Sequence, residues 1–422
     1  MGTSAANQIR IADLREPRRS GDELRVFEIA KAMQIDLAPS RLVDAARWRT
    51  GLDDFGDPTV LDRLTAQIAT VETDEGLSGL GRYLIKRRLV GLLSARLRFE
   101  DFVKRYPEAL ATQVEAPIIV VGLPRSGTTH LVNLLATDTR LRSLPWWEAA
   151  EPIPVLGDGP AANGIDQRYL RCEADYLASK KISPLTSLMH DRHPSSIEEE
   201  CELLDLDLCT YVLEWHARVP AWRDYADQLD QVGHYSFLRR QLQVLSYLRG
   251  PRRWVLKCPQ HLERLDALMT TFPDATIAFT LRDPVAVLQS AVTMLAYGDR
   301  HRRLHVDADE LVAYWTDRIE GLLRCSLRDV GVIPDSQRVD VGFDEFMSDD
   351  VGMATRILQT AGLPVNDEVR HQFATYVEGH PRGRDGRVAY DLRNDFGVDP
   401  ADLYERFAFY FEAFPQIRKE VG

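Results

Sequence analysis

Cysteine is scarce in this sequence and is not spaced for a metal site or a disulfide framework. The 422 residues include five cysteines, an odd number, and no two of them form a C-x-x-C pair. Zinc sites and disulfide-rich secreted domains depend on such pairs or on an even set of cysteines. We therefore expect no metal, and reduced thiols would suit a cytoplasmic protein.

Long apolar runs and an excess of basic charge are missing as well. No stretch of about 18 apolar residues occurs, so we expect no transmembrane segment. The first twenty residues contain no apolar signal core, which also favours the cytoplasm. The formal charge of −12 and the pI near 5.4 argue against a nucleic-acid partner. An anionic ligand would therefore need a local basic pocket.

The pattern of apolar residues predicts an α/β fold with a parallel β-sheet flanked by helices. We expect residues 1–113 to form a helical region that packs on the core, and residues 114–422 to form the main domain. A helical insertion is expected at about 160–250. Strands alternating with helices indicate a parallel sheet that binds ligands at the carboxyl ends of its strands. The expected strands are IIVVG from 118, RRWVLK from 252, ATIAFTL from 275 and, more weakly, RVDVGF from 338.

The segment GLPRSGTT, residues 122–129, joins the first of these strands to a helix. Gly122 and Gly127 have the spacing of an ATP-binding loop, but Thr128 replaces the lysine that reaches the β- and γ-phosphates. Glycines turn backbone N–H groups toward an anion, and the following helix adds the positive end of its dipole. Arg125 adds a permanent cation. This pattern favours phosphate binding and weakens the case for ATP-dependent phosphoryl transfer.

GLPRSGTT resembles the 5′-phosphosulfate-binding loop of sulfotransferases, which use 3′-phosphoadenosine 5′-phosphosulfate (PAPS). LRDPVAVLQS resembles the 3′-phosphate element of that family, an arginine that ends a strand and a serine eight residues later, here Arg282 and Ser290. Two helical turns separate the pair, so both can face one phosphate. Cytosolic sulfotransferases have lysine at the position of Arg125. In this respect the sequence resembles the bacterial and tyrosylprotein sulfotransferases more closely. The resemblance implies the P-loop fold that sulfotransferases share with nucleotide kinases.

The resemblance also assigns residues to the binding of PAPS, or of its product 3′-phosphoadenosine 5′-phosphate (PAP). The expected ligands in the two segments are Arg125, Ser126, Gly127, Thr128, Thr129, Arg282 and Ser290. An arginine-rich loop near the end of the sequence adds Arg382 and Arg384, for which a solvated charged loop is the alternative.

Catalytic residues follow from the same resemblance. In the bacterial and tyrosylprotein subgroup, a glutamate some twenty residues after the loop acts as base, and a lysine at a strand end assists transfer. LPWWEAAEP supplies Glu148 and VLKCP supplies Lys257, with Arg125 as the third catalytic candidate. Glu151, or His193 in RHPSSIEEE, is an alternative base.

The resemblance thus predicts a PAPS-dependent sulfotransferase that modifies a hydroxyl group of a small molecule or glycolipid and needs no metal. Two alternatives stay open: an ATP-dependent small-molecule kinase, and a catalytically inactive nucleotide-binding protein. The sequence identifies neither the acceptor nor the oligomeric state.

Overall fold

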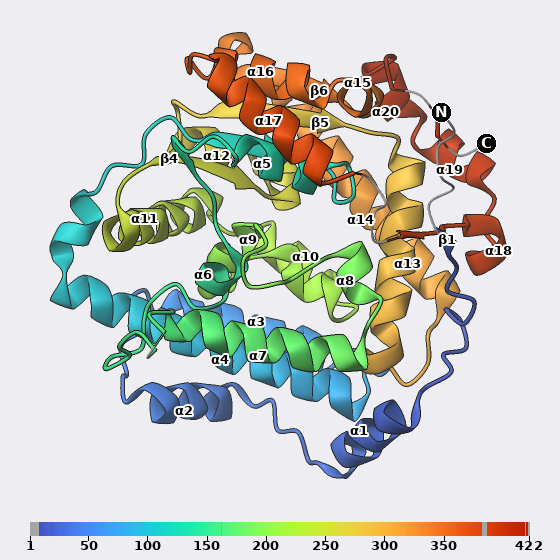
Figure 1. Cartoon of the computed structure of the whole chain (residues 1–422). Helices are drawn as coiled ribbons and strands as arrows, with labels where there is room; N and C mark the ends of the chain where they lie inside the picture. The colour runs from blue at the N-terminus through green and yellow to red at the C-terminus, as the bar shows by residue number, and fades with distance from the viewer. Residues whose placement is uncertain (1–7, 162, 382–385, 418, 421–422) are drawn as a thin grey trace.

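A five-stranded sheet organises the chain, in the strand order β3-β4-β2-β5-β6. The computed structural model describes residues 8–161, 163–381, 386–417 and 419–420. Each strand runs parallel to its neighbours, which confirms the predicted α/β fold with a parallel sheet (Figure 1). The strands are β2 (Ile118–Val121), β3 (Leu141–Arg142), β4 (Arg253–Lys257), β5 (Thr276–Leu281) and β6 (Arg338–Gly342). A separate parallel pair joins β1 (Gln8–Ile9) to β7 (Arg387–Val388).

Helices cover both faces of this sheet. One layer contains α5 (Thr128–Leu135), α16 (Asp350–Thr360) and α17 (Asp367–Gly379). The other contains α11 (Gln231–Arg249), α12 (Leu265–Thr271), α13 (Pro284–Arg302) and α14 (Ala308–Asp329). Ile118 and Val120 of β2 pack on the first layer, and Ile119 and Val121 pack on the second. All four side chains are fully buried, as expected for a central parallel strand with helices on both sides.

Between β3 and β4 the chain forms a largely helical insertion. It consists of α6 (Trp146–Ala150), α7 (Gln167–Ile182), α8 (Thr186–Met189), α9 (Cys201–Leu204), α10 (Pro220–Ala226) and α11. After β6 come α15 (Phe343–Ser348), α16, α17, α18 (Leu392–Phe396), α19 (Pro400–Arg406) and α20 (Ala408–Ala413). The short 3₁₀ helices are Pro107–Ala111, Asp205–Asp207, Tyr211–Trp215, Pro259–Glu263, Val330–Val332 and Asp335–Gln337.

The helices before the sheet pack largely on this insertion. They are α1 (Gly21–Ala32), α2 (Pro39–Thr50), α3 (Thr59–Val71) and α4 (Gly79–Arg105). Apolar side chains of α2, α3 and α4 form one buried cluster with Trp222 of α10, and Arg63 of α3 makes a buried ion pair with Asp207 (2.6 Å). Figure 1 shows α2, α3, α4 and α7 together on the side of the molecule away from α16 and α17. We propose that residues 114–422 form the main domain. Residues 1–113 would then be a helical region that packs on the insertion of this domain.

In the part of the chain that the structure describes, no helix combines the length and the apolar character needed to cross a membrane.

Gly81 of α4 is a point of close contact between these first helices and the sheet layer. A Cβ atom at Gly81 would lie 2.1 Å from the carbonyl oxygen of Arg302, at the end of α13. We expect Gly81→Ala to lower the free energy of unfolding by about 1–3 kcal/mol, because a backbone oxygen cannot move aside alone. A lower midpoint of thermal unfolding would show this loss.

Gly91→Ala in the same helix is the matched control. Among the described residues, no other segment lies within 4 Å of the position that its Cβ atom would take. Alanine favours a helix over glycine by roughly 1 kcal/mol, so this variant should unfold at the same temperature or higher. Equal destabilisation by both substitutions would contradict the close packing at Gly81.

Candidate functional site

Three strand ends meet at the carboxyl edge of the sheet. β2 lies between β4 and β5, with Val120 opposite Lys257 and Val121 opposite Phe279. The loop that follows β2 therefore leaves the sheet between Lys257, which ends β4, and Arg282, which follows β5. This edge is where parallel α/β sheets bind their ligands.

The loop after β2 has a backbone that depends on its glycines. A Cβ atom at Gly122 would lie 1.7 Å from the Thr280 hydroxyl oxygen, so only glycine fits beside β5. Gly127 has a φ of 84°, in the left-handed region that glycine adopts without strain. Arg125 also has a positive φ, 67°, which is uncommon for a residue with a side chain. Ser126 then secures the loop through a hydrogen bond between its hydroxyl and that of Thr280 (2.7 Å).

Helix α5 begins directly after this loop, at Thr128. The N–H groups of its first turn have no acceptor within the helix, and they carry the positive end of the helix dipole. The residue before the helix, Gly127, has no side chain that could cap them. The loop and the helix start therefore offer N–H donors to an anion, and the binding of phosphate there stays a prediction.

Arg125, Arg282 and Ser290 come together at this loop. Arg125 donates from Nε to the Ser290 hydroxyl (3.0 Å) and from Nη1 to the carbonyl oxygen of Met189. Arg282 donates from Nη1 to the carbonyl oxygen of Arg125 (2.6 Å). The three side chains line a cavity of about 190 Å³, together with Glu420. The loop at 122–129 and the segment from Arg282 to Ser290 thus line the same cavity, which contains two arginines.

Lys257 is buried at the end of β4, with 1% of its surface exposed. Its Nζ donates to Glu199 Oε1 (2.5 Å), and its backbone N–H donates to Glu200 Oε2 (2.7 Å). Burial alone would lower the pKa of Lys257, but the charges of Glu199 and Glu198 outweigh it and raise the pKa. The ammonium group therefore stays protonated beside a carboxylate.

The two neighbours of Glu199 are held by other partners. Glu198 contacts His190 Nε2 (3.0 Å) and Arg192 (3.4 Å). Burial would raise the pKa of Glu198, but these two groups hold it well below its usual range. Glu200 Oε1 lies 2.7 Å from His261 Nε2. Glu199 is the glutamate of this run whose carboxylate contacts the ammonium group of Lys257, and its side chain keeps 17% of its surface exposed.

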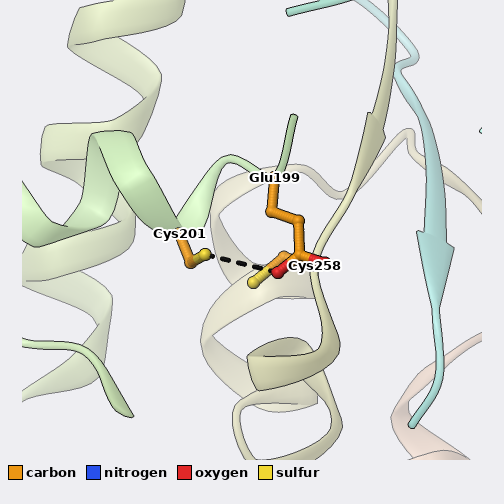
Figure 2. Close-up of side chains that lie close together, drawn as sticks. All are labelled: Glu199, Cys201 and Cys258. Atoms are coloured by element: carbon orange, nitrogen blue, oxygen red, sulfur yellow. Dashed lines mark hydrogen bonds between the residues drawn. The ribbon is translucent and has the colours of Figure 1, made fainter. Parts of the chain in front are cut away.

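Two thiols also lie beside Glu199 (Figure 2). Cys201 donates to Glu199 Oε2 (3.5 Å), and Cys258 completes the one group of potential metal ligands found among the described residues. A hydrogen bond that the Cys201 thiol donates to Cys258, together with burial, raises the pKa of Cys201, and burial raises that of Cys258. The ammonium group of Lys257, bonded to the same Glu199 carboxylate, disfavours a cation at this position.

Glu148, the expected base, lies elsewhere. Its carboxylate is fully buried and pairs with Arg142 (3.2 Å) and Arg249 (3.0 Å). Arg142 lies in β3 beside the start of β4, and Arg249 precedes β4, whereas Lys257 ends that strand. The two guanidinium groups thus hold Glu148 toward the other end of β4. The carboxylate beside the Lys257 ammonium group belongs to Glu199 instead, and the role of Glu148 as base stays a prediction.

The other candidates have separate positions. Glu151 pairs with Arg171 of α7 (2.7 Å). His193 packs edge-on against two tyrosine rings of the same helix. Arg382 and Arg384 lie outside the described residues.

Sequence reasoning did not select Glu199. The available signal was the run of three glutamates at 198–200, within the segment RHPSSIEEE that also contains the alternative base His193. Three adjacent carboxylates look alike in sequence, and only the contact with the Lys257 ammonium group distinguishes the middle one.

Comparison with known proteins gives matches over most of the chain. A model of the sulfotransferase family matches residues 117–367. A curated relative, the omega-hydroxy-beta-dihydromenaquinone-9 sulfotransferase Stf3 of Mycobacterium bovis, is 24% identical over 262 residues, which is 59% of this chain. The chain spans 63% of the length of that relative.

Two solved structures are similar over nearly the whole fold. Sulfotransferase STF1 from Mycobacterium tuberculosis H37Rv is 29% identical, with a TM-score of 0.78, and the match covers 89% of this chain and 100% of that one. Sulfotransferase STF9 from Mycobacterium avium is 25% identical, with a TM-score of 0.81, and the match covers 92% of this chain and 100% of that one.

Proposed function

The chain belongs to the sulfotransferase family, and we propose that it transfers the sulfuryl group of PAPS to a hydroxyl group of an apolar, lipid-like acceptor. One observation carries the proposal. Arg125, Arg282 and Ser290 meet in one cavity, at a phosphate-binding loop that has no lysine. PAPS carries a phosphosulfate and a separate phosphate, so its binding requires two anion sites next to each other.

The roles of the loop residues follow from their positions. We assign the 5′-phosphosulfate to Arg125 and to the backbone N–H groups of Ser126, Gly127, Thr128 and Thr129, at the start of α5. The 3′-phosphate is assigned to Arg282 and Ser290, the two residues that resemble the 3′-phosphate element of the family. Arg382 and Arg384 remain further candidates for phosphate contacts.

The acceptor is proposed from a relative and from the surroundings of the loop. Stf3 acts on a hydroxylated menaquinone, an apolar molecule with a hydroxyl group. In this chain Met189 of α8 binds Arg125 through its carbonyl oxygen, and Leu185 and Leu188 beside it are partly buried apolar residues. An apolar acceptor, such as a lipid or a glycolipid, could pack against these leucines.

We propose Glu199 as the base, in place of Glu148. The acceptor oxygen forms a bond to sulfur while its proton passes to the Glu199 carboxylate, and the bond from sulfur to the 5′-phosphate oxygen breaks. Negative charge grows on that leaving oxygen, where Lys257 and Arg125 would stabilise it. By analogy with phosphoryl transfer, positioning and charge stabilisation account for most of the rate.

Binding of PAP without a metal is the first test. A ligand at a hundred times its Kd adds about 2.7 kcal/mol to the stability of the folded state. We therefore expect PAP to raise the midpoint of thermal unfolding in buffer with EDTA. Stabilisation by Mg-ATP but not by PAP would instead support a kinase, and PAP binding with no turnover of any hydroxylated lipid would support an inactive nucleotide-binding protein.

The 3′-phosphate site is tested with Arg282→Ala. A charge-assisted hydrogen bond is worth about 1.5–3 kcal/mol, so the affinity for PAP should fall roughly tenfold or more. Adenosine 5′-phosphosulfate (APS) lacks the 3′-phosphate, and its affinity should change little. Arg25→Ala, at an exposed position of α1, removes the same charge and serves as the control. Equal loss for both ligands would show that Arg282 supports the fold rather than the phosphate.

The choice of base is tested by comparing Glu199→Gln with Glu148→Gln. Loss of a general base lowers kcat by roughly 10²–10⁴, so Glu199→Gln should do so while PAP affinity stays almost unchanged. Glu148→Gln should mainly lower the unfolding temperature, because it weakens the buried pairs with Arg142 and Arg249. Normal turnover by Glu199→Gln, with loss of turnover by a folded Glu148→Gln, would reverse the assignment.

A further inference from the structure

The cavity that we assign to the 3′-phosphate contains a carboxylate of the chain itself. Glu420 lines this cavity together with Arg125, Arg282 and Ser290. Glu420 Oε1 accepts a hydrogen bond from Arg282 Nε (2.9 Å), and Oε2 accepts one from Nη2 (2.7 Å). Two parallel bonds of this kind are how arginine binds carboxylates and phosphates alike.

Glu420 is held in place by its own backbone N–H and by the side chain of the preceding residue, Lys419. Its N–H donates to Asp283 Oδ2 (2.6 Å), and the Tyr404 hydroxyl donates to the same oxygen (2.9 Å). The ammonium group of Lys419 lies 4.6 Å from the centre of the Tyr404 ring. Asp283 also accepts from the N–H of Val285 and so caps α13, the helix that carries Ser290. The position of Glu420 is thus tied to the start of that helix.

The remaining contacts of Arg282 restrict how a phosphate could reach it. Nη1 donates to the carbonyl oxygen of Arg125, and the guanidinium carbon lies 3.8 Å from the centre of the Phe343 ring. The edge formed by Nε and Nη2 is left for a bidentate ligand, and Glu420 occupies both positions. A phosphate that binds through this edge must displace the Glu420 carboxylate.

We infer that Glu420 competes with the 3′-phosphate for Arg282 and so limits the affinity for PAPS and PAP. The inference rests on the proposed function, because it assumes that the 3′-phosphate binds Arg282. A phosphate monoester carries a charge of about −1.5 to −2 and three acceptor oxygens, so it can replace a single carboxylate. Breaking the Glu420–Arg282 pair subtracts from the binding free energy. When PAP leaves after transfer, Glu420 binds Arg282 again and favours release of the product.

The test compares PAP and APS on three proteins by titration calorimetry: the unchanged chain, Glu420→Gln and Glu412→Gln. Glu412 is an exposed glutamate of α20, and its substitution changes the net charge by the same amount. Because the displaced pair is partly exposed, we expect Glu420→Gln to strengthen PAP binding roughly three- to tenfold. Neither APS binding nor the Glu412→Gln variant should show this gain.

A double variant separates competition from an indirect effect on the fold. In the Arg282→Ala background, Glu420→Gln should no longer change PAP affinity, because the pair that it breaks is already absent. Equal PAP affinity of the unchanged chain and Glu420→Gln overturns the inference alone. The same gain for APS, for Glu412→Gln or in the Arg282→Ala background also overturns it. If none of the proteins binds PAP, the proposed function fails, and the inference fails with it.

Discussion

Three consecutive carboxylates beside the end of β4, of which Glu198 and Glu200 are buried and Glu199 is partly buried, are the constraint on which the site depends. A buried charge costs several kcal/mol unless a partner compensates it. Glu198, Glu199 and Glu200 therefore need partners, and they find them in the insertion, at the tip of β4 and in the segment that follows it. The backbone N–H and the side chain of Lys257 bind two of the three. These bonds hold the insertion against the end of β4. The ammonium group of Lys257 and the Glu199 carboxylate are thereby fixed relative to each other.

The anion site is organised by contacts that exist before any ligand binds. Arg125 adopts a positive φ, and its side chain is held by Ser290 of α13 and by the carbonyl oxygen of Met189 in α8. The carbonyl oxygen of Arg125 in turn accepts from Arg282. Donors that are already oriented stabilise developing charge without a further cost of reorganisation. An arginine fixed in this way can take over part of the charge compensation that the lysine provides in ATP-binding loops.

An acidic protein that binds an anion must concentrate positive charge locally. The formal charge is −12, yet two arginines converge on the loop after β2. Two of the three cations around this loop are offset by carboxylates: Arg282 pairs with Glu420, and the nearby Lys257 pairs with Glu199. The charge of Arg125 therefore remains among these five groups, and arginine keeps its charge under all ordinary conditions. Such a balance keeps the cations in place while a more highly charged ligand can still replace a carboxylate.

The sequence by itself determined the parallel sheet, the loop at 122–129 and the second element, Arg282 with Ser290. These features depend on spacing along one strand or helix, and the resemblance to sulfotransferases rests on the same short segments. The base and the occupant of the phosphate site depend on tertiary contacts. Glu148 and Glu199 are both glutamates near aromatic or apolar residues, and only the fold pairs one with two arginines and the other with Lys257. Glu420 reaches Arg282 across 138 residues of sequence. No local pattern encodes such pairs, because the desolvation of each charge is set by whichever partner the folded chain brings to it.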